Sequence, residues 1–282
     1  MQFVLFTDNL ADLTISEVCT AAKQAGFDGL DLTVRPGGHV KPGNVELELS
    51  AARRAADAAG MAIPMITTAL TDVDSPHAEA VFASAAHYGV RYIKLGYWPY
   101  QPFGTAAKQI DDARAKLARL AKLGTKYNVL PCVHCHSGRI LANGGATLYL
   151  ILRDFKPTEA AAYVDTMHMT VEGGLAGWEM GLDLLAPWVR LVGVKNFRWV
   201  EGGRDDKKQM KFRAEYVPLA DGQARLADFM AYLKQLKYEG VVSLHSEYKE
   251  DGSFRQLDTK ELLAQSAADL AYLKSVIGQP AR

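Results

Sequence analysis

The segment AAKQAGFDGLDLTV, residues 21–34, contains the unit that decides the fold. An alanine-rich stretch of helical character stops at Gly26, and a mostly apolar run suited to a buried strand follows from Phe27 to Val34. Glycine just past a helix adopts the left-handed conformation at little cost and turns the chain into the next element. The segment therefore predicts a helix that is followed at once by a strand.

The same order recurs along the chain. AADAAG (55–60), AAHYG (85–89) and LKYEG (236–240) each precede an apolar run. Eight strands are expected, beginning near Phe3, Phe27, Met61, Arg91, Val129, Ala161, Leu191 and Val241. Strands that alternate with helices indicate a parallel sheet, and eight such units in a chain of this length predict an α/β fold, a closed (β/α)8 TIM barrel in one domain over residues 1–282.

A doubly wound open sheet is the alternative architecture. No Gly-x-Gly-x-x-Gly turn follows the first expected strand, which argues against dinucleotide binding. The polar stretch 202–208 predicts a long loop near residues 200–217, after the seventh strand. In a barrel such a loop lies on the catalytic face.

Composition narrows the class of partner. The 282 residues are 49% hydrophobic and carry 32 basic and 32 acidic side chains, so the formal net charge is zero. A neutral balance does not favour nucleic acid or an anionic membrane surface, and a small, weakly charged substrate is expected. The N-terminus lacks a secretory pattern, no apolar run could span a bilayer, and three cysteines are too few for a disulfide framework, so a cytoplasmic location is expected.

Polar side chains end three of the expected strands. The apolar runs finish in 134–136 (HCH), 165–168 (DTMH) and 245–247 (HSE), all residue types that bind metals or move protons. In a (β/α)8 barrel the carboxyl ends of the strands form the active-site face. These three endings are therefore expected to converge on one pocket.

Strand alternation selects which of these side chains point inward. His134 and His136 share a face with Cys132, while Cys135 points the other way, so a Cys-x-x-Cys zinc clip is disfavoured. Asp165 either joins the pocket or caps the following helix. The inward set comprises His134, His136, Asp165, His245 and Glu247.

Other candidates lie near the strand ends. Lys195 sits in an apolar run, where a lysine either serves a site or extends its ammonium to solvent, and Lys94 is a similar case. Trp98 and Trp199 follow expected strands and are interpreted as walls on which a sugar stacks, with ordinary loop packing as the alternative.

These residues resemble the xylose-isomerase-like TIM-barrel superfamily, which includes the sugar phosphate isomerases and epimerases. The similarity rests mainly on 164–169 (VDTMHM), 217–222 (VPLADG) and Glu247, and it extends over nearly the whole chain. The strings 136–138 (HSG) and 170–174 (TVEGG) resemble a divergent branch associated with the breakdown of sugars, including keto-glycosides.

The resemblance implies a divalent metal. Typical members hold it with Glu, Asp, His and Glu on strands five to eight; Asp165 and Glu247 match, whereas His134 and Gly193 stand where Glu and His are expected. His134, Asp165 and Glu247 would suit Mn, Zn, Co or Fe better than Mg. The alternative is that the metal is lost and Lys195 supplies the positive charge.

The resemblance also implies a reaction, removal of the proton next to a carbonyl of a keto-sugar. His136, Glu247 and Lys195 are the expected catalytic residues. Isomerisation or epimerisation follows if the proton returns, and a lyase that releases the aglycone of a 3-keto-glycoside follows if a substituent leaves. A non-catalytic sugar-binding barrel or partner subunit is the third possibility. The expected substrate contacts are His168, Lys94, Trp98, Trp199 and His245.

An endonuclease of the same superfamily is disfavoured, because it needs more metal-binding carboxylates and a basic face. The expected partner is a small-molecule sugar, with no nucleic acid and no membrane. A homo-oligomer or a small partner subunit is also compatible with the sequence.

Overall fold

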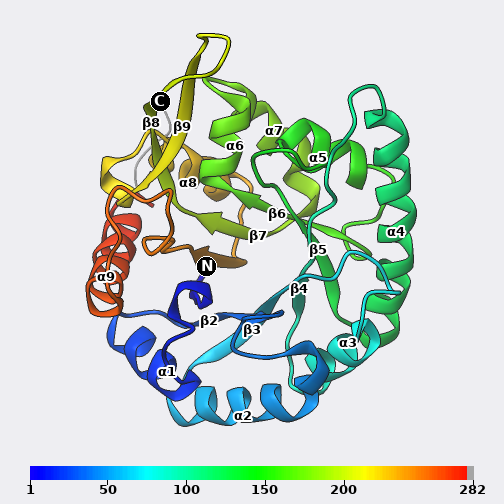
Figure 1. The fold of residues 1–282 in the computed structure, drawn as a ribbon. Coiled ribbons are helices and arrows are strands. Elements are labelled where there is room, and N and C mark those ends of the chain that lie inside the picture. Colours follow the sequence, from blue (N-terminus) through cyan, green and yellow to red (C-terminus); the bar gives the residue numbers. More distant parts are fainter. Residues whose placement is uncertain (278–282) are drawn as a thin grey trace.

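The eight expected strands form a closed parallel barrel in the computed structural model, which describes residues 1–277 (Figure 1). They lie around the barrel in the order β1-β10-β7-β6-β5-β4-β3-β2. The open-sheet alternative is therefore wrong. The barrel strands are β1 Gln2–Phe6, β2 Gly29–Val34, β3 Ala62–Thr68, β4 Tyr92–Lys94, β5 Leu130–His134, β6 Ala161–Asp165, β7 Val189–Val194 and β10 Val241–Leu244.

Helices surround the barrel as an outer ring (Figure 1). The α-helices are α1 Ile15–Gln24, α2 Val45–Ala58, α3 Ala78–His87, α4 Ala106–Tyr127, α5 Gly145–Leu152, α6 Thr166–Gly173, α7 Gly177–Leu185, α8 Leu226–Gln235 and α9 Thr259–Val276. The short 3-10 turns are Asp8–Leu10, Pro42–Asn44, Ala186–Trp188 and Leu219–Asp221. No helix within residues 1–277 has the length and apolar character needed to cross a membrane.

Glycines end the helices largely as expected. Gly26, Gly60 and Gly89 all have positive φ, at 88°, 64° and 74°, and each precedes a barrel strand. The fourth repeat differs, because there the positive φ of 54° belongs to Lys237 rather than Gly240. The helix-to-strand unit recognised at residues 21–34 is thus repeated in space, with one variant turn.

The core has two layers, and they confirm the strand alternation. A large outer layer packs helices on the barrel and includes Cys135. A small inner layer fills the barrel and includes Cys132 and Tyr163. The other buried members of the inner layer are Val4, Met65, Leu130, Ala161, Leu191 and Val241. The two cysteines therefore face opposite sides of β5, and all three cysteines are free.

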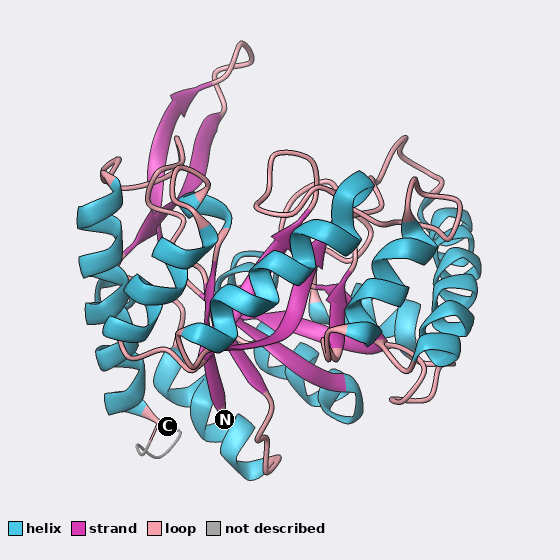
Figure 2. Ribbon diagram, turned by 90° about the horizontal axis from the view of Figure 1, so that it is seen from below, coloured by secondary structure: helices cyan, strands magenta, loops and turns pink. Residues whose placement is uncertain are grey.

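Residues 200–217 do not form the expected long loop. They belong to an antiparallel hairpin of β8 Asn196–Arg204 and β9 Met210–Val217, which projects beyond the carboxyl end of the barrel (Figure 2). A cross-strand ion pair joins Glu215 to Arg198, and a second ion pair joins Glu215 to Arg213 on its own strand. Opposed charges of this kind stabilise a ribbon whose polar sequence resembles a loop.

Two glycines allow α5 and α7 to touch. A Cβ placed on Gly145 would lie 2.3 Å from the Cα of Gly181, so any side chain there must push the helices apart. We expect Gly145→Ala to lower the free energy of unfolding by about 1–3 kcal/mol through overpacking. Gly177→Ala, at the start of α7 in open space, is the matched control and should change stability by less than about 1 kcal/mol. Denaturant unfolding of both variants measures this, and equal effects would contradict it.

Candidate active site

Polar residues at the ends of β5, β7 and β10 line one cavity of about 220 Å³ inside the carboxyl end of the barrel. We call it the site cavity. Its lining residues are Phe6, Asp8, Arg35, Thr67, Lys94, Tyr97, His134, His136, Tyr163, Lys195, Tyr216, His245, Glu247 and Glu250. The fifth and eighth strand endings therefore meet in this cavity, and Lys195 joins them from the end of β7. The sixth ending does not reach it, since Asp165 and His168 are not among the lining residues.

A buried ion pair crosses this cavity. The Lys195 Nζ donates to Glu247 Oε2 at 2.8 Å, and the lysine is only 3% exposed. Although burial disfavours its charge, the carboxylates of Glu247 and Asp165 raise the pKa of Lys195. Burial acts against Glu247 too, but Lys195 and His245 hold the pKa of this carboxyl well below its usual range. Both groups are charged at neutral pH.

His136 is a neutral imidazole with a defined tautomer. Its Nδ1 lies 2.8 Å from the Ser137 carbonyl oxygen, which can only accept, so Nδ1 carries the proton and Nε2 keeps its lone pair. Burial, followed by the charge of Lys195, lowers the pKa of His136 to about 4. At neutral pH this side chain can therefore accept a proton.

His168 lies behind His136. The two rings are 3.7 Å apart between centroids, and His168 Nδ1 shares a 2.8 Å hydrogen bond with Ser137 Oγ. Burial, with Lys195 and the neighbouring histidines, lowers the pKa of His168 well below its usual range. It supports His136 from the rear and is not part of the cavity lining.

Asp165 caps the following helix and is not among the residues that line the site cavity. Its Oδ1 accepts the backbone N–H of His168 at 2.9 Å and so caps α6. Its Oδ2 is buried without a hydrogen bond and lies 3.5 Å from His134 Nε2, which is also unbonded. His134 is held by the Tyr97 hydroxyl at its other nitrogen, at 3.0 Å. Burial and the positive charge of Lys94 lower the pKa of His134 well below its usual range.

The floor of the cavity is a network around Asp31, which sequence reasoning missed. Its buried carboxylate accepts hydrogen bonds from Thr67 at 2.7 Å, Ser243 at 2.9 Å and Tyr163 at 3.3 Å. The Tyr163 hydroxyl also pairs with His245 Nε2 at 2.6 Å. A carboxylate inside the apolar run of β2 was the sequence feature that could have revealed this network.

Neither tryptophan reaches the site cavity. Trp98 is buried in the outer core layer, where its indole N–H donates to the Thr71 carbonyl at 3.0 Å. Trp199 lies on β8, is 45% exposed, and packs edge-on against Phe197. The aromatic wall of the cavity consists instead of Phe6, Tyr97 and Tyr216. Tyr97 follows β4, and Tyr216 lies on β9.

The residues expected to bind metal do not make a complete ligand set. His134 Nε2 and Asp165 Oδ2 are spaced like two ligands of one ion, since ligands at about 2.1 Å in tetrahedral geometry lie about 3.4 Å apart. The third, Glu247, is bonded to an ammonium group instead. Within residues 1–277, no group of three or more His, Cys, Asp or Glu side chains is arranged to hold a metal ion.

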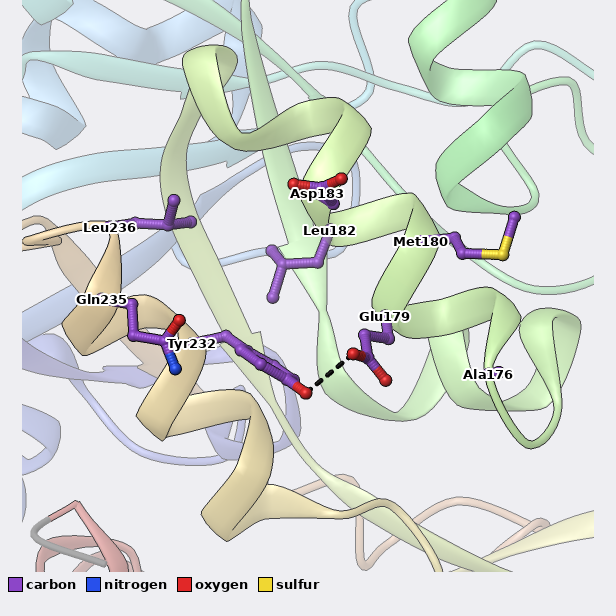
Figure 3. A pocket seen from close by; sticks show the side chains of 8 residues that line it. All are labelled: Ala176, Glu179, Met180, Leu182, Asp183, Tyr232, Gln235 and Leu236. Atoms are coloured by element: carbon purple, nitrogen blue, oxygen red, sulfur yellow. Dashed lines mark hydrogen bonds between the residues drawn. The ribbon is translucent and has the colours of Figure 1, made fainter. Parts of the chain in front are cut away.

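A larger hollow of about 450 Å³ lies outside the barrel, between α7 and α8 (Figure 3). Its polar contact is a hydrogen bond from the Tyr232 hydroxyl to Glu179 at 2.7 Å. Met180 and Leu236 at its edges are exposed. Its lining residues include no histidine or lysine.

Comparison with protein families agrees with this fold. The family described as xylose isomerase-like TIM barrel matches residues 19–276. The chain belongs to this family. No curated protein matches its sequence.

Solved structures of the same fold are distant in sequence. A D-psicose 3-epimerase, crystallised with D-fructose, has a TM-score of 0.73 at 16% identity over 99% of this chain and 100% of its own. The probable 3-DHS dehydratase AsbF of Bacillus anthracis has 0.73 at 14%, over 96% and 99%. The 3-keto-D-glucoside 4-epimerase YcjR of E. coli has 0.71 at 14%, over 98% and 99%. At these identities the likeness extends to the fold alone.

Lys94 is a buried cation in the site cavity and generates a pH prediction. Its Nζ lies 3.7 Å from the centroid of the Tyr97 ring. Burial, followed by the charge of Arg35, lowers the pKa of Lys94 from 10.5 to about 7. Between these two pKa values Lys94 holds a proton in the unfolded chain but not in the folded one. The free energy of unfolding therefore rises with pH over this range. From pH 7 to 9.5 the wild type should gain roughly 3 kcal/mol relative to Lys94→Met.

Denaturant unfolding of both proteins at the two pH values measures this gain. Lys108→Met is the control, because Lys108 is 78% exposed on α4, and its difference from the wild type should not change with pH. A constant difference for Lys94→Met would contradict the prediction.

Proposed function

We propose that this barrel is a sugar isomerase or epimerase that removes the proton next to the carbonyl of a keto-sugar. One observation carries the proposal: His136, a neutral imidazole with a free Nε2, lines the same small cavity as the buried Lys195 ammonium. A base and a fixed positive charge are what enolisation needs. The epimerases of similar fold, whose names specify keto-sugars, support the substrate class.

In the proposed reaction, His136 Nε2 takes the proton and the electrons of the broken C–H bond form the double bond of an enediolate. The carbonyl oxygen becomes an oxyanion, and Lys195 donates to it. An ammonium has three donors, of which Glu247 uses one. Return of the proton to a different carbon gives isomerisation, and return to the opposite face gives epimerisation.

Elimination from a 3-keto-glycoside is the second candidate, and one observation favours it. Epimerisation requires a second base on the other face of the substrate, and Glu247 is engaged by Lys195 at 2.8 Å and faces His245 at 3.5 Å. A lyase needs only one base: the electron pair left by the abstracted proton forms a carbon–carbon double bond as the C–O bond to the aglycone breaks, and the aglycone oxygen takes the proton from His136. Deuterium in recovered sugar indicates the first reaction, and free aglycone indicates the second.

His136→Asn tests the proposed base. Asparagine can still donate to the Ser137 carbonyl but has no basic nitrogen, so the rate should fall by about 10²–10⁴-fold. Hydrogen–deuterium exchange into a panel of keto-sugars and 3-keto-glycosides in D₂O, followed by NMR and mass spectrometry, measures it. His87→Asn, at the end of α3 outside the cavity, is the control and should retain the wild-type rate.

If no sugar in the panel exchanges or loses its aglycone, and His136→Asn has no effect, the enzyme proposal fails. The alternative is then a non-catalytic sugar-binding barrel, and calorimetric titration with the same panel of sugars identifies the ligand.

A further inference from the structure

We propose that the Lys195 ammonium takes the place of a divalent cation in this barrel, so that the site works without a metal. The inference rests on the proposed function, because it concerns the charge that stabilises the enediolate. Its tests, however, measure metal binding directly and do not depend on turnover.

The position of Lys195 is the first argument. In the barrel, β7 lies between β6 and β10, and Asp165 and Glu247 come from these two neighbours. Lys195 directly follows β7, so its side chain starts between the strands that supply the two acidic groups. It bonds to Glu247 at 2.8 Å and is electrostatically coupled to Asp165. A cation of the protein thus already neutralises the acids that would attract a metal.

The closed space at Gly193 is the second argument. This glycine stands where the family resemblance expects a histidine ligand. A Cβ at Gly193 would lie 2.8 Å from Asp165 Oδ2 and 3.3 Å from the Tyr163 ring. A side chain there would require the Asp165 carboxylate to shift, and the glycine itself has no side chain, so β7 supplies no ligand from this position. Lys195, two residues later on the same face, is the side chain of this segment that enters the site cavity.

The remaining donors explain why a metal would otherwise be expected. His134 Nε2 and Asp165 Oδ2 are unbonded, buried and 3.5 Å apart, as two ligands of one ion would be. A divalent ion between them would be repelled by the Lys195 ammonium and would have to compete with it for Glu247. Residue 195 therefore decides whether this incomplete set binds metal.

The first experiment is metal analysis of the wild-type protein purified without chelators, with calorimetric titration of Mn²⁺. We expect less than about 0.1 equivalent of bound metal and no stoichiometric Mn²⁺ binding. One equivalent of divalent metal in the purified protein, or tight one-to-one binding of Mn²⁺, overturns the proposal.

The second experiment is Lys195→His, which removes the repelling charge and adds a nitrogen ligand beside His134, Asp165 and Glu247. We expect one equivalent of Mn²⁺ to bind at least about 100-fold more tightly than to the wild type, two factors of ten in Kd. Lys94→His, at the other cavity lysine, is the control and should bind no more Mn²⁺ than the wild type. Circular dichroism verifies that both variants are folded.

A folded Lys195→His protein that binds Mn²⁺ no better than the wild type overturns the claim that residue 195 decides whether the site binds a metal. These outcomes are separate from those of the proposed function. If the wild type exchanges the protons of no sugar and also binds no metal, the proposed enzyme activity is contradicted. The proposal that Lys195 takes the place of a divalent cation is then still supported.

Discussion

A buried charge must have a partner, and at the carboxyl end of this barrel that requirement organises the site. Lys195 and Glu247 satisfy each other across the ends of β7 and β10. Removing one member of such a pair leaves an uncompensated charge in a low dielectric, which is strongly destabilising. The charge of Lys195 also reaches the histidines on the neighbouring elements, where it adds to burial in lowering the pKa values of His136 and His168. Burial and this one ammonium therefore act together to disfavour the charged forms of both histidines.

The histidines at the cavity are fixed in place by hydrogen bonds to neighbouring residues. Ser137 holds His136 through its carbonyl and His168 through its hydroxyl, while Tyr97 holds His134. Below them, Asp31 joins side chains from β3, β6 and β10, which are far apart in sequence. The polar site is therefore anchored to a polar floor, and the apolar inner layer of the barrel lies around and beneath this floor.

Much of this arrangement follows from sequence periodicity. The alternation of strand residues was enough to place His134 inward and Cys135 outward, and the recurring apolar runs were enough to count the strands. Asp31 was not recognised, because its partners Thr67 and Ser243 become neighbours only when the barrel closes. Trp98 was placed at the site because it follows a strand, but the loop carries its indole into the core. The sequence did not decide whether the Lys195 ammonium reaches solvent or the site. The burial of a lysine depends on the elements that pack over it, which the sequence does not show.

The base of the β8–β9 hairpin contributes residues to the site cavity. Lys195 immediately precedes β8, and Tyr216 of β9 pairs with Phe197 across the base of the ribbon, so both cavity-lining residues belong to the end of the hairpin nearest the barrel. The outer half, from Glu201 to Phe212, reaches away from that end. The cavity lining and the exposed tip therefore belong to different stretches of a single ribbon. Substitutions at the tip can change the surface presented beside the barrel while Lys195 and Tyr216 keep their places in the cavity.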